Sequence, residues 1–192
     1  MNPIPILIVV LVIVVAVVAA TAWWYSQKRR SEQLHQRFGP EYERAVDEHG
    51  DRGRAEAALE DRKERVEQLH LRPLSPEQRD RFGPEWRHLQ ARFVDVPEEA
   101  VKQADSLVAE VMAARGYPTG DFEQRVADVS VDHPQVVEHY RAAHAIALRM
   151  KEGGQANTED LRQAMVHYRA LFENLLETDT PEPISTSRKS SS

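Results

Sequence analysis

Histidine is the residue type in this sequence whose pattern comes nearest to a reactive site. Half of the eight histidines lie in the C-terminal third of the chain: His133, His139, His144 and His167. Pairs that chelate zinc from one helix stand at i,i+3 or i,i+4, and no two histidines here have either spacing. A site would have to join His139 or His144 to His167 across two helices, together with a carboxylate such as Asp132 or Glu138. We therefore expect no metal ligand, no cofactor and no catalytic residue.

Other reactive groups are missing from the sequence or have a structural interpretation. The 192-residue chain has no cysteine, which excludes disulfides, thiolate zinc sites and a cysteine nucleophile. It also has no glycine-rich phosphate loop, no Gly-x-Ser-x-Gly elbow and no His-Glu-x-x-His motif. The acidic pairs Glu98-Glu99 and Glu159-Asp160 fall in the first turns of predicted helices, where carboxylates favour the helix dipole. We expect a protein that is not an enzyme.

Charge is distributed unevenly along the chain. Residues 31–192 hold 22 basic and 31 acidic side chains, a formal net charge of −9. A domain with this charge repels nucleic acid. We therefore expect no nucleic-acid partner.

The first 25 residues have the composition of a membrane span. Residues 4–25 contain no charged side chain, and a helix of 22 residues is about 33 Å long, enough to cross a hydrocarbon core of about 30 Å. The alternative is a cleaved signal peptide, because Ala20-Thr21-Ala22 resembles a cleavage site. An n-region without Lys or Arg and the long apolar run favour an uncleaved helix that anchors the chain in the lipid bilayer.

Aromatic and basic side chains follow this span. They are the predicted membrane-interface residues: Trp23, Trp24, Tyr25, Lys28, Arg29 and Arg30. Since no basic residue precedes the span, the positive-inside rule places the rest of the chain in the cytoplasm of a bacterial cell, with an extracytoplasmic domain as the alternative.

The rest of the chain has helical periodicity up to Glu177. The predicted fold class is all-α: a transmembrane helix followed by a bundle of about six or seven helices built from helical hairpins. The predicted segments are a short N-terminus (1–3), the transmembrane helix (4–25), a basic juxtamembrane segment (26–30), the helical domain (31–177) and a disordered tail (178–192).

Two short sequences occur twice. Arg37-Phe38-Gly39-Pro40-Glu41-Tyr42 returns as Arg81-Phe82-Gly83-Pro84-Glu85-Trp86, and we expect a kink or a new helix start at each Gly-Pro. We interpret the repeated rings as core packing, with a duplicated docking knob as the alternative. The tetrapeptide His139-Tyr140-Arg141-Ala142 returns as His167-Tyr168-Arg169-Ala170, in two helices predicted to lie antiparallel.

A set of motifs resembles a family of bacterial proteins without an established activity, many of which have one N-terminal membrane span. The motifs are the two hexapeptides and the segments 92–95, 114–118, 121–125, 130–134 and 140–144. The resemblance covers residues 31–176. It implies a bacterial source and a helical domain outside the membrane, and it implies no activity.

Three functional classes are compatible with these features. The first is a non-catalytic interaction or scaffold module at the bacterial inner membrane, with a protein partner. The second is a small-ligand or sensor domain, with Trp86, Tyr140, His144 and Tyr168 as candidate interaction or pocket residues. The third is a histidine-dependent hydrolase, although the position of His144 on an apolar stripe favours a buried, hydrogen-bonded side chain.

Overall fold

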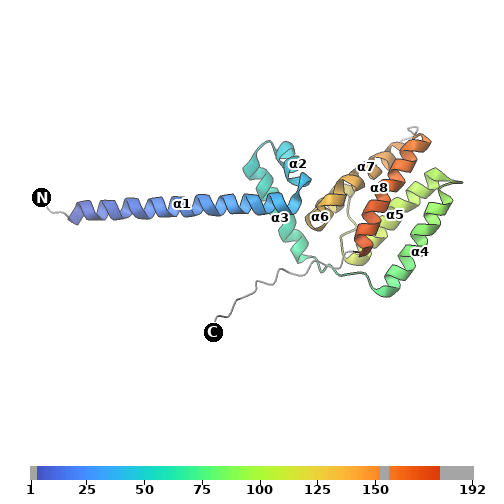
Figure 1. The fold of residues 1–192 in the computed structure, drawn as a ribbon, viewed down its shortest axis with the longest axis horizontal. Coiled ribbons are helices and arrows are strands. Elements are labelled where there is room, and N and C mark those ends of the chain that lie inside the picture. Colours follow the sequence, from blue (N-terminus) through green and yellow to red (C-terminus); the bar gives the residue numbers. More distant parts are fainter. Residues whose placement is uncertain (1–3, 152–155, 178–192) are drawn as a thin grey trace. The chain divides into compact units, whose positions relative to one another are not determined.

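Every regular element that the structure describes is an α-helix, which confirms the all-α prediction. The computed structural model describes residues 4–151 and 156–177, without the side chains of residues 4–10 and 12. The helices are α1 (Ile4–Phe38), α2 (Pro40–His49), α3 (Arg52–Gln68), α4 (Pro76–Arg92), α5 (Pro97–Arg115), α6 (Phe122–Asp132), α7 (Pro134–Lys151) and α8 (Thr158–Glu177) (Figure 1). The segments 1–3 and 178–192, for which we expected a short N-terminus and a disordered tail, lie outside the described residues.

Helix α1 is longer than the predicted span. It continues through the basic residues 28–30 to Phe38, where Gly39 has a φ of 50° and ends it. Within the part of the chain that is described, no helix has the length and apolar character needed to cross a membrane.

The chain divides into two compact units, Met1–Glu60 and Asp61–Ser192. In the first unit a polar network joins three helices. Tyr42 of α2 donates its hydroxyl to Glu56 of α3 over 2.7 Å, and Arg52 donates to the Tyr42 oxygen over 2.7 Å and also bonds Ser31 of α1. Because Glu56 is almost fully buried, these donors offset the cost of placing a carboxylate in the interior.

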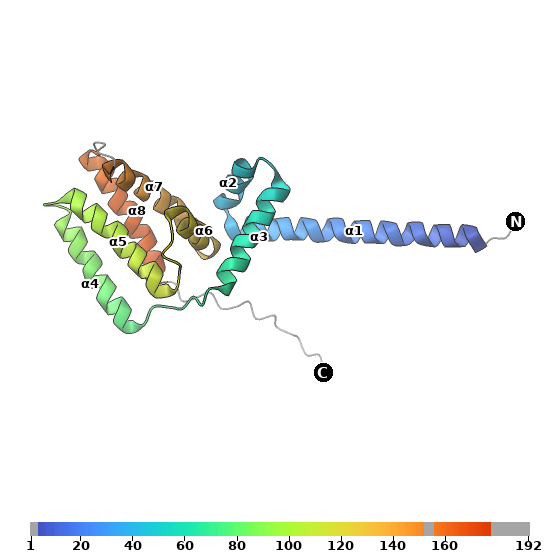
Figure 2. The same cartoon turned by 180° about the vertical axis from the view of Figure 1, so that it is seen from behind.

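The second unit is held by one continuous apolar core. Helices α7 and α8 lie side by side and antiparallel, α5 contacts α4, α7 and α8, and α6 contacts α7 (Figures 1 and 2). The wide apolar face of α8 contributes Leu171, Phe172 and Leu175, all of which are buried. This confirms the prediction that the last two helices form a hairpin.

Side-chain caps begin several helices. Ser75 forms a capping box with Gln78 before α4, and Asp51 and Asn157 accept backbone N–H groups at the starts of α3 and α8. Helix α5 begins after Val96 without a side-chain cap.

Candidate functional site

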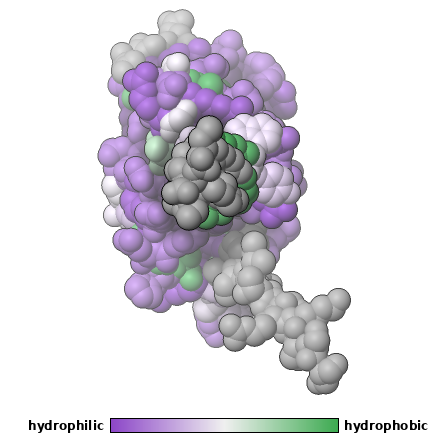
Figure 3. Space-filling model, turned by 90° about the vertical axis from the view of Figure 1, so that its left-hand side faces the viewer, coloured by the Kyte–Doolittle hydropathy of each residue, from purple (hydrophilic) through white to green (hydrophobic). Residues whose placement is uncertain are grey.

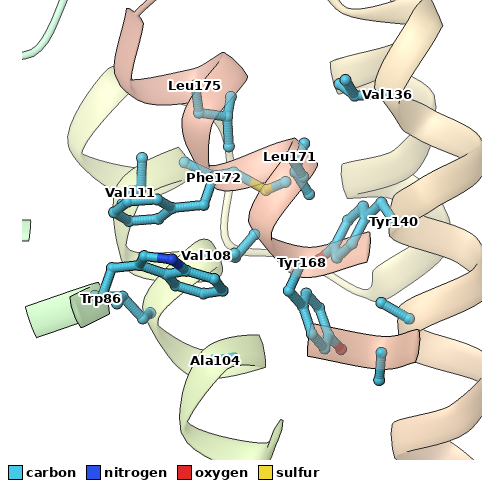
Figure 4. Close-up of a cluster of buried hydrophobic side chains, with 14 of the residues drawn as sticks. Trp86, Ala104, Val108, Val111, Val136, Tyr140, Tyr168, Leu171, Phe172 and Leu175 are labelled. Atoms are coloured by element: carbon cyan, nitrogen blue, oxygen red, sulfur yellow. The ribbon is translucent and has the colours of Figure 1, made fainter. Parts of the chain in front are cut away.

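Three of the four candidate pocket residues are brought together, and the fourth is placed elsewhere in the core. Tyr140 and Tyr168 lie together on one side of α8, whereas Trp86 lies on the other side beside Phe172 (Figure 4). The Trp86 and Phe172 rings are stacked, with centroids 4.8 Å apart and an interplanar angle of 17°. Trp86 therefore belongs to the apolar packing between α4 and α8.

Asp105 of α5, which sequence reasoning did not single out, is the centre of the remaining site. The Tyr168 hydroxyl donates to Asp105 Oδ1 over 2.9 Å, and His144 Nδ1 lies 3.8 Å from the same oxygen. Both the Asp105 and the His144 side chains keep 18 % of their surface exposed. The site therefore lies at the edge of the bundle, within reach of solvent.

Helix α6 supplies the other side of the site. Arg125 Nε donates to the Tyr140 hydroxyl over 3.1 Å. The Phe122 ring is stacked on the His144 ring, with centroids 3.6 Å apart and an interplanar angle of 10°, and meets Tyr140 edge-on at 4.9 Å. We call the following residues the Asp105 cluster: Asp105, Phe122, Arg125, Tyr140, His144 and Tyr168.

Burial shifts the pKa of each titratable ring in the Asp105 cluster toward its neutral form. It raises the pKa of Tyr168, which nearby Asp105 raises further, and it raises the pKa of Tyr140 to about 12 against the opposing charge of Arg125. Burial also lowers the pKa of His144, with Asp105 opposing it. At neutral pH the two phenols and the imidazole are therefore uncharged.

This arrangement is poorly suited to nucleophilic catalysis. His144 Nδ1 is buried without a hydrogen-bond partner, and 3.8 Å is too long for a hydrogen bond to Asp105. Asp105 accepts its hydrogen bond from the Tyr168 hydroxyl. It therefore does not orient the His144 ring as the carboxylate of a catalytic triad would. The expectation of a hydrogen-bonded, buried His144 is wrong, because the ring is half-buried and held by stacking on Phe122.

A second polar contact joins the two copies of the repeated tetrapeptide. His139 of α7 and His167 of α8 bring their Nδ1 atoms to 2.9 Å, and their ring centroids are 5.1 Å apart. In each helix the next residue is a buried tyrosine, so the duplicated sequence places equivalent side chains face to face between α7 and α8. Spacing along a single helix gave no signal for this pair.

The carboxylates that a histidine site would have recruited make other contacts. Asp132 accepts from Tyr117 over 3.3 Å, and Glu138 pairs with Arg141 at 3.2 Å. His133 is buried and lies 2.6 Å from Asn174 through Nδ1. Among residues 4–151 and 156–177, no three His, Asp or Glu side chains are grouped as a metal site.

The predicted membrane-interface residues form their own contacts on α1. Trp23, Trp24 and Tyr25 are 70 %, 64 % and 53 % exposed. Arg29 donates to the Tyr25 hydroxyl over 2.8 Å, and its guanidinium lies 4.5 Å from the ring centre. Lys28 lies 6.0 Å from the Trp24 ring, and Arg30 lies 3.8 Å from Glu60 of α3.

Comparison of the chain with protein-family models, with curated proteins and with solved structures finds no match. Any functional conclusion therefore depends on the contacts described above.

Proposed function

We propose that this chain is a membrane-anchored interaction module of the bacterial inner membrane, with no catalytic activity of its own. In this proposal residues 4–25 span the bilayer, and the helical domain binds a protein partner. The domain lies in the cytoplasm, because the basic residues Lys28, Arg29 and Arg30 directly follow the span. An extracytoplasmic domain is the alternative orientation.

The observation that carries the proposal is the exposure of apolar side chains on every side of α1. Leu11 and five residues from Ile13 to Val18 are 52–63 % exposed. Successive residues of a helix point about 100° apart, so these side chains face all directions around the axis. A helix at the surface of a water-soluble domain is apolar along one stripe, whereas one that is apolar all round needs an apolar environment.

The surroundings of this segment support a bilayer as that environment. In Figure 3, which looks along α1, green hydrophobic residues are visible close to the axis of this helix. The exposed rings of Trp23, Trp24 and Tyr25 follow the apolar segment and precede the basic residues, which is the order found at a membrane–water interface.

Anchoring and orientation are tested with single cysteines, because the native chain has none. Ser106→Cys places a thiol on the exposed face of α5, and Asn2→Cys places one before the span. We expect the protein to remain in the membrane fraction after alkaline carbonate washing. In whole spheroplasts an impermeant maleimide should label Asn2→Cys and spare Ser106→Cys until the membrane is permeabilised. Extraction by carbonate would contradict the anchor, and the reverse labelling would establish the alternative orientation.

The interaction role is tested by affinity capture from a bacterial host after crosslinking in intact cells. The matched control carries residues 31–192 behind an unrelated transmembrane helix. We expect both proteins to recover the same partner, because the proposal assigns binding to the helical domain. Recovery by neither would contradict the role of the domain, and recovery by the native span alone would assign binding to the membrane helix.

A sensor of a small ligand is the second candidate function. It is favoured by the position of the Asp105 cluster at the edge of the bundle. There an acidic and a basic side chain, Asp105 and Arg125, lie beside the rings of the cluster and could contact a small polar ligand. A ligand bound there would raise the melting temperature of the wild type and have less effect on His144→Ala. The hydrolase candidate has weaker support, because Asp105 does not hydrogen-bond His144.

A further inference from the structure

We propose that the contact between His139 and His167 is a pH-sensitive switch, which holds α7 against α8 until both imidazole rings are protonated. The two Nδ1 atoms are 2.9 Å apart, which is a hydrogen-bond distance. The ring centroids are 5.1 Å apart, so the rings lie nearly end to end and each Nδ1 points at the other. The contact is therefore a hydrogen bond from one imidazole to the other.

Such a hydrogen bond needs a different tautomer on each ring. One ring donates from a protonated Nδ1 and keeps a lone pair on Nε2, while the other accepts on the lone pair of Nδ1 and carries its proton on Nε2. A first additional proton can bind Nε2 of the donor ring, which leaves the hydrogen bond in place and makes its donor cationic. Charge-assisted hydrogen bonds are stronger than neutral ones. Uptake of one proton therefore preserves the contact.

A second additional proton breaks the contact, because the accepting Nδ1 is the nitrogen that remains for it to bind. Both Nδ1 atoms then carry a hydrogen, and no lone pair is left between them. Two cationic rings with centroids 5.1 Å apart also repel each other. The rings must move apart, which loosens the packing of α7 on α8 at this point.

The surroundings of the pair do little to offset this repulsion. On both helices the residues at i±3 and i±4 from the histidines are glutamine, alanine, valine or leucine. The closest acidic side chains along the two helices are paired with arginines: Glu138 with Arg141 at 3.2 Å, and Glu173 with Arg169 at 2.7 Å. The second proton is therefore taken up against the charge of the first.

The direction of the pH effect follows from the protonation of His167. Burial lowers the pKa of His167, and the charge of His139 lowers it further. In acid the folded state therefore holds fewer protons than the unfolded state, in which histidine has a pKa of about 6.5. The stabilisation from the contact is present above about pH 6.5 and is lost as the pH falls through the lowered folded-state pKa. Mild acid should thus loosen the hairpin of α7 and α8.

The switch adjoins the contacts that join this hairpin to α5 and α6. Tyr140 and Tyr168 directly follow the two histidines, and both are fully buried. Arg125 of α6 donates to the Tyr140 hydroxyl, and Asp105 of α5 accepts from Tyr168 and lies 3.8 Å from His144. Separation of the two imidazoles would therefore act on the helical turns that hold the Asp105 cluster together. This response would not depend on the membrane anchor.

The test compares amide hydrogen exchange of the full-length, detergent-solubilised protein at about pH 7.5 and about pH 5, corrected for the intrinsic effect of pH. Wild-type peptides from α7 and α8 should exchange about threefold or more faster at the lower pH. His139→Gln and His167→Gln should each abolish this increase, because glutamine donates and accepts hydrogen bonds without becoming charged. The matched control is His88→Gln, which removes an exposed histidine of α4 and should respond as the wild type does.

Nuclear magnetic resonance of wild-type protein labelled with ¹⁵N-histidine keeps the test decisive if a variant fails to fold. With His139 and His167 assigned, the two rings together should carry one proton on Nδ1 and one on Nε2 at about pH 7.5. On acidification they should take up their two protons in separate steps. Protons on both Nε2 atoms, or uptake in one step, would overturn the proposal. Unchanged exchange of the wild type in acid, or the same increase in both folded variants, would also overturn it.

Discussion

The two copies of the Arg-Phe-Gly-Pro-Glu-aromatic hexapeptide bury aromatic rings at the same two positions but have different backbone conformations. In the first copy Gly39 has φ 50° and ψ −123°, α1 ends, and α2 begins at Pro40. In the second copy Gly83 and Pro84 lie inside α4, which continues to Arg92. Of the two outcomes expected at each Gly-Pro, a kink or a new helix start, the first copy has a new helix start, and the second copy has none because Pro84 lies inside α4.

Tertiary contacts explain the difference. In the first copy the change of direction at Gly39 lets the Tyr42 hydroxyl reach Glu56 and Arg52 of α3. In the second copy a continuous helix keeps Phe82 and Trp86 on one face, where both rings are buried. Burying two aromatic rings outweighs the helix-interior cost of proline, which is about 3 kcal/mol. The hexapeptide thus specifies which rings are buried, and contacts with neighbouring helices determine whether its backbone is broken or continuously helical.

The largest expected effect comes from removing the ring that both copies share. Phe38→Ala and Phe82→Ala should each lower the free energy of unfolding by about 3–5 kcal/mol, because both side chains are buried. Denaturant unfolding followed by circular dichroism of the solubilised chain measures this. Wild-type stability in either variant would favour the alternative of a docking knob at that copy.

Substitution of the two prolines should separate the copies. Pro84→Ala should raise the free energy of unfolding by about 2 kcal/mol, because it relieves a helix-interior penalty of about 3 kcal/mol and returns about 1 kcal/mol of entropy to the unfolded chain. Pro84 is exposed, so no packing is lost. Pro40→Ala is the matched control and should change stability by less than about 1 kcal/mol, since Pro40 is the first residue of α2. If Pro84→Ala and Pro40→Ala changed the free energy of unfolding equally in the same assay, the assigned difference between the two prolines, one within a helix and one at a helix start, would be contradicted.

A methyl group at each glycine tests the backbone directly. Gly39→Ala should lower the free energy of unfolding by about 1–2 kcal/mol, because an L-residue is strained at positive φ. The added carbon itself meets nothing within 4 Å. Gly83→Ala should lower the free energy of unfolding by less. Alanine has a higher helix propensity than glycine, and this gain opposes the loss caused by Pro84, which disfavours the helical conformation of a non-glycine residue before it. Thermal melts of both variants measure the difference. A larger loss at position 83 would contradict the assigned backbones.

The smallest expected effect concerns the polar network of the first copy. Burial raises the pKa of Glu56, but hydrogen bonds from Tyr42, Ser31 and Arg52 together outweigh it and leave the pKa below its usual value. The folded state therefore holds fewer protons than the unfolded state in acid, so the stabilisation is present above about pH 4.5 and is lost as the pH falls through the folded-state pKa.

Tyr42→Phe removes one of these donors. It should lower the free energy of unfolding by about 1 kcal/mol at pH 7 and reduce the further loss between about pH 5 and pH 3. Tyr25→Phe, at an exposed tyrosine, is the control and should leave the pH dependence unchanged. Unfolding curves at a series of pH values give both quantities. A steeper acid loss in Tyr42→Phe would contradict the stabilising role of the network.

The candidate site was predictable only in part. The apolar stripes of the last two helices placed Tyr140 and Tyr168 inside the bundle, and both are fully buried. Asp105 and Arg125 gave no signal, because an isolated acidic or basic residue in an amphipathic helix resembles any other solvated side chain. Trp86 was predicted to line a pocket between its own helix and the last two helices, and its ring stacks on Phe172.

The sequence by itself determined the helices, several of their caps and most of the buried side chains. Those properties depend on local backbone preference and on the period of apolar residues, which one chain segment carries without its neighbours. Tertiary structure decided which polar groups meet: Asp105 with Tyr168, His139 with His167, and Tyr42 with Glu56. Each pair is separated by between 14 and 63 residues and joins different helices, so its distance depends on how those helices pack. The same packing decided that one Gly-Pro ends a helix and that the other lies within one.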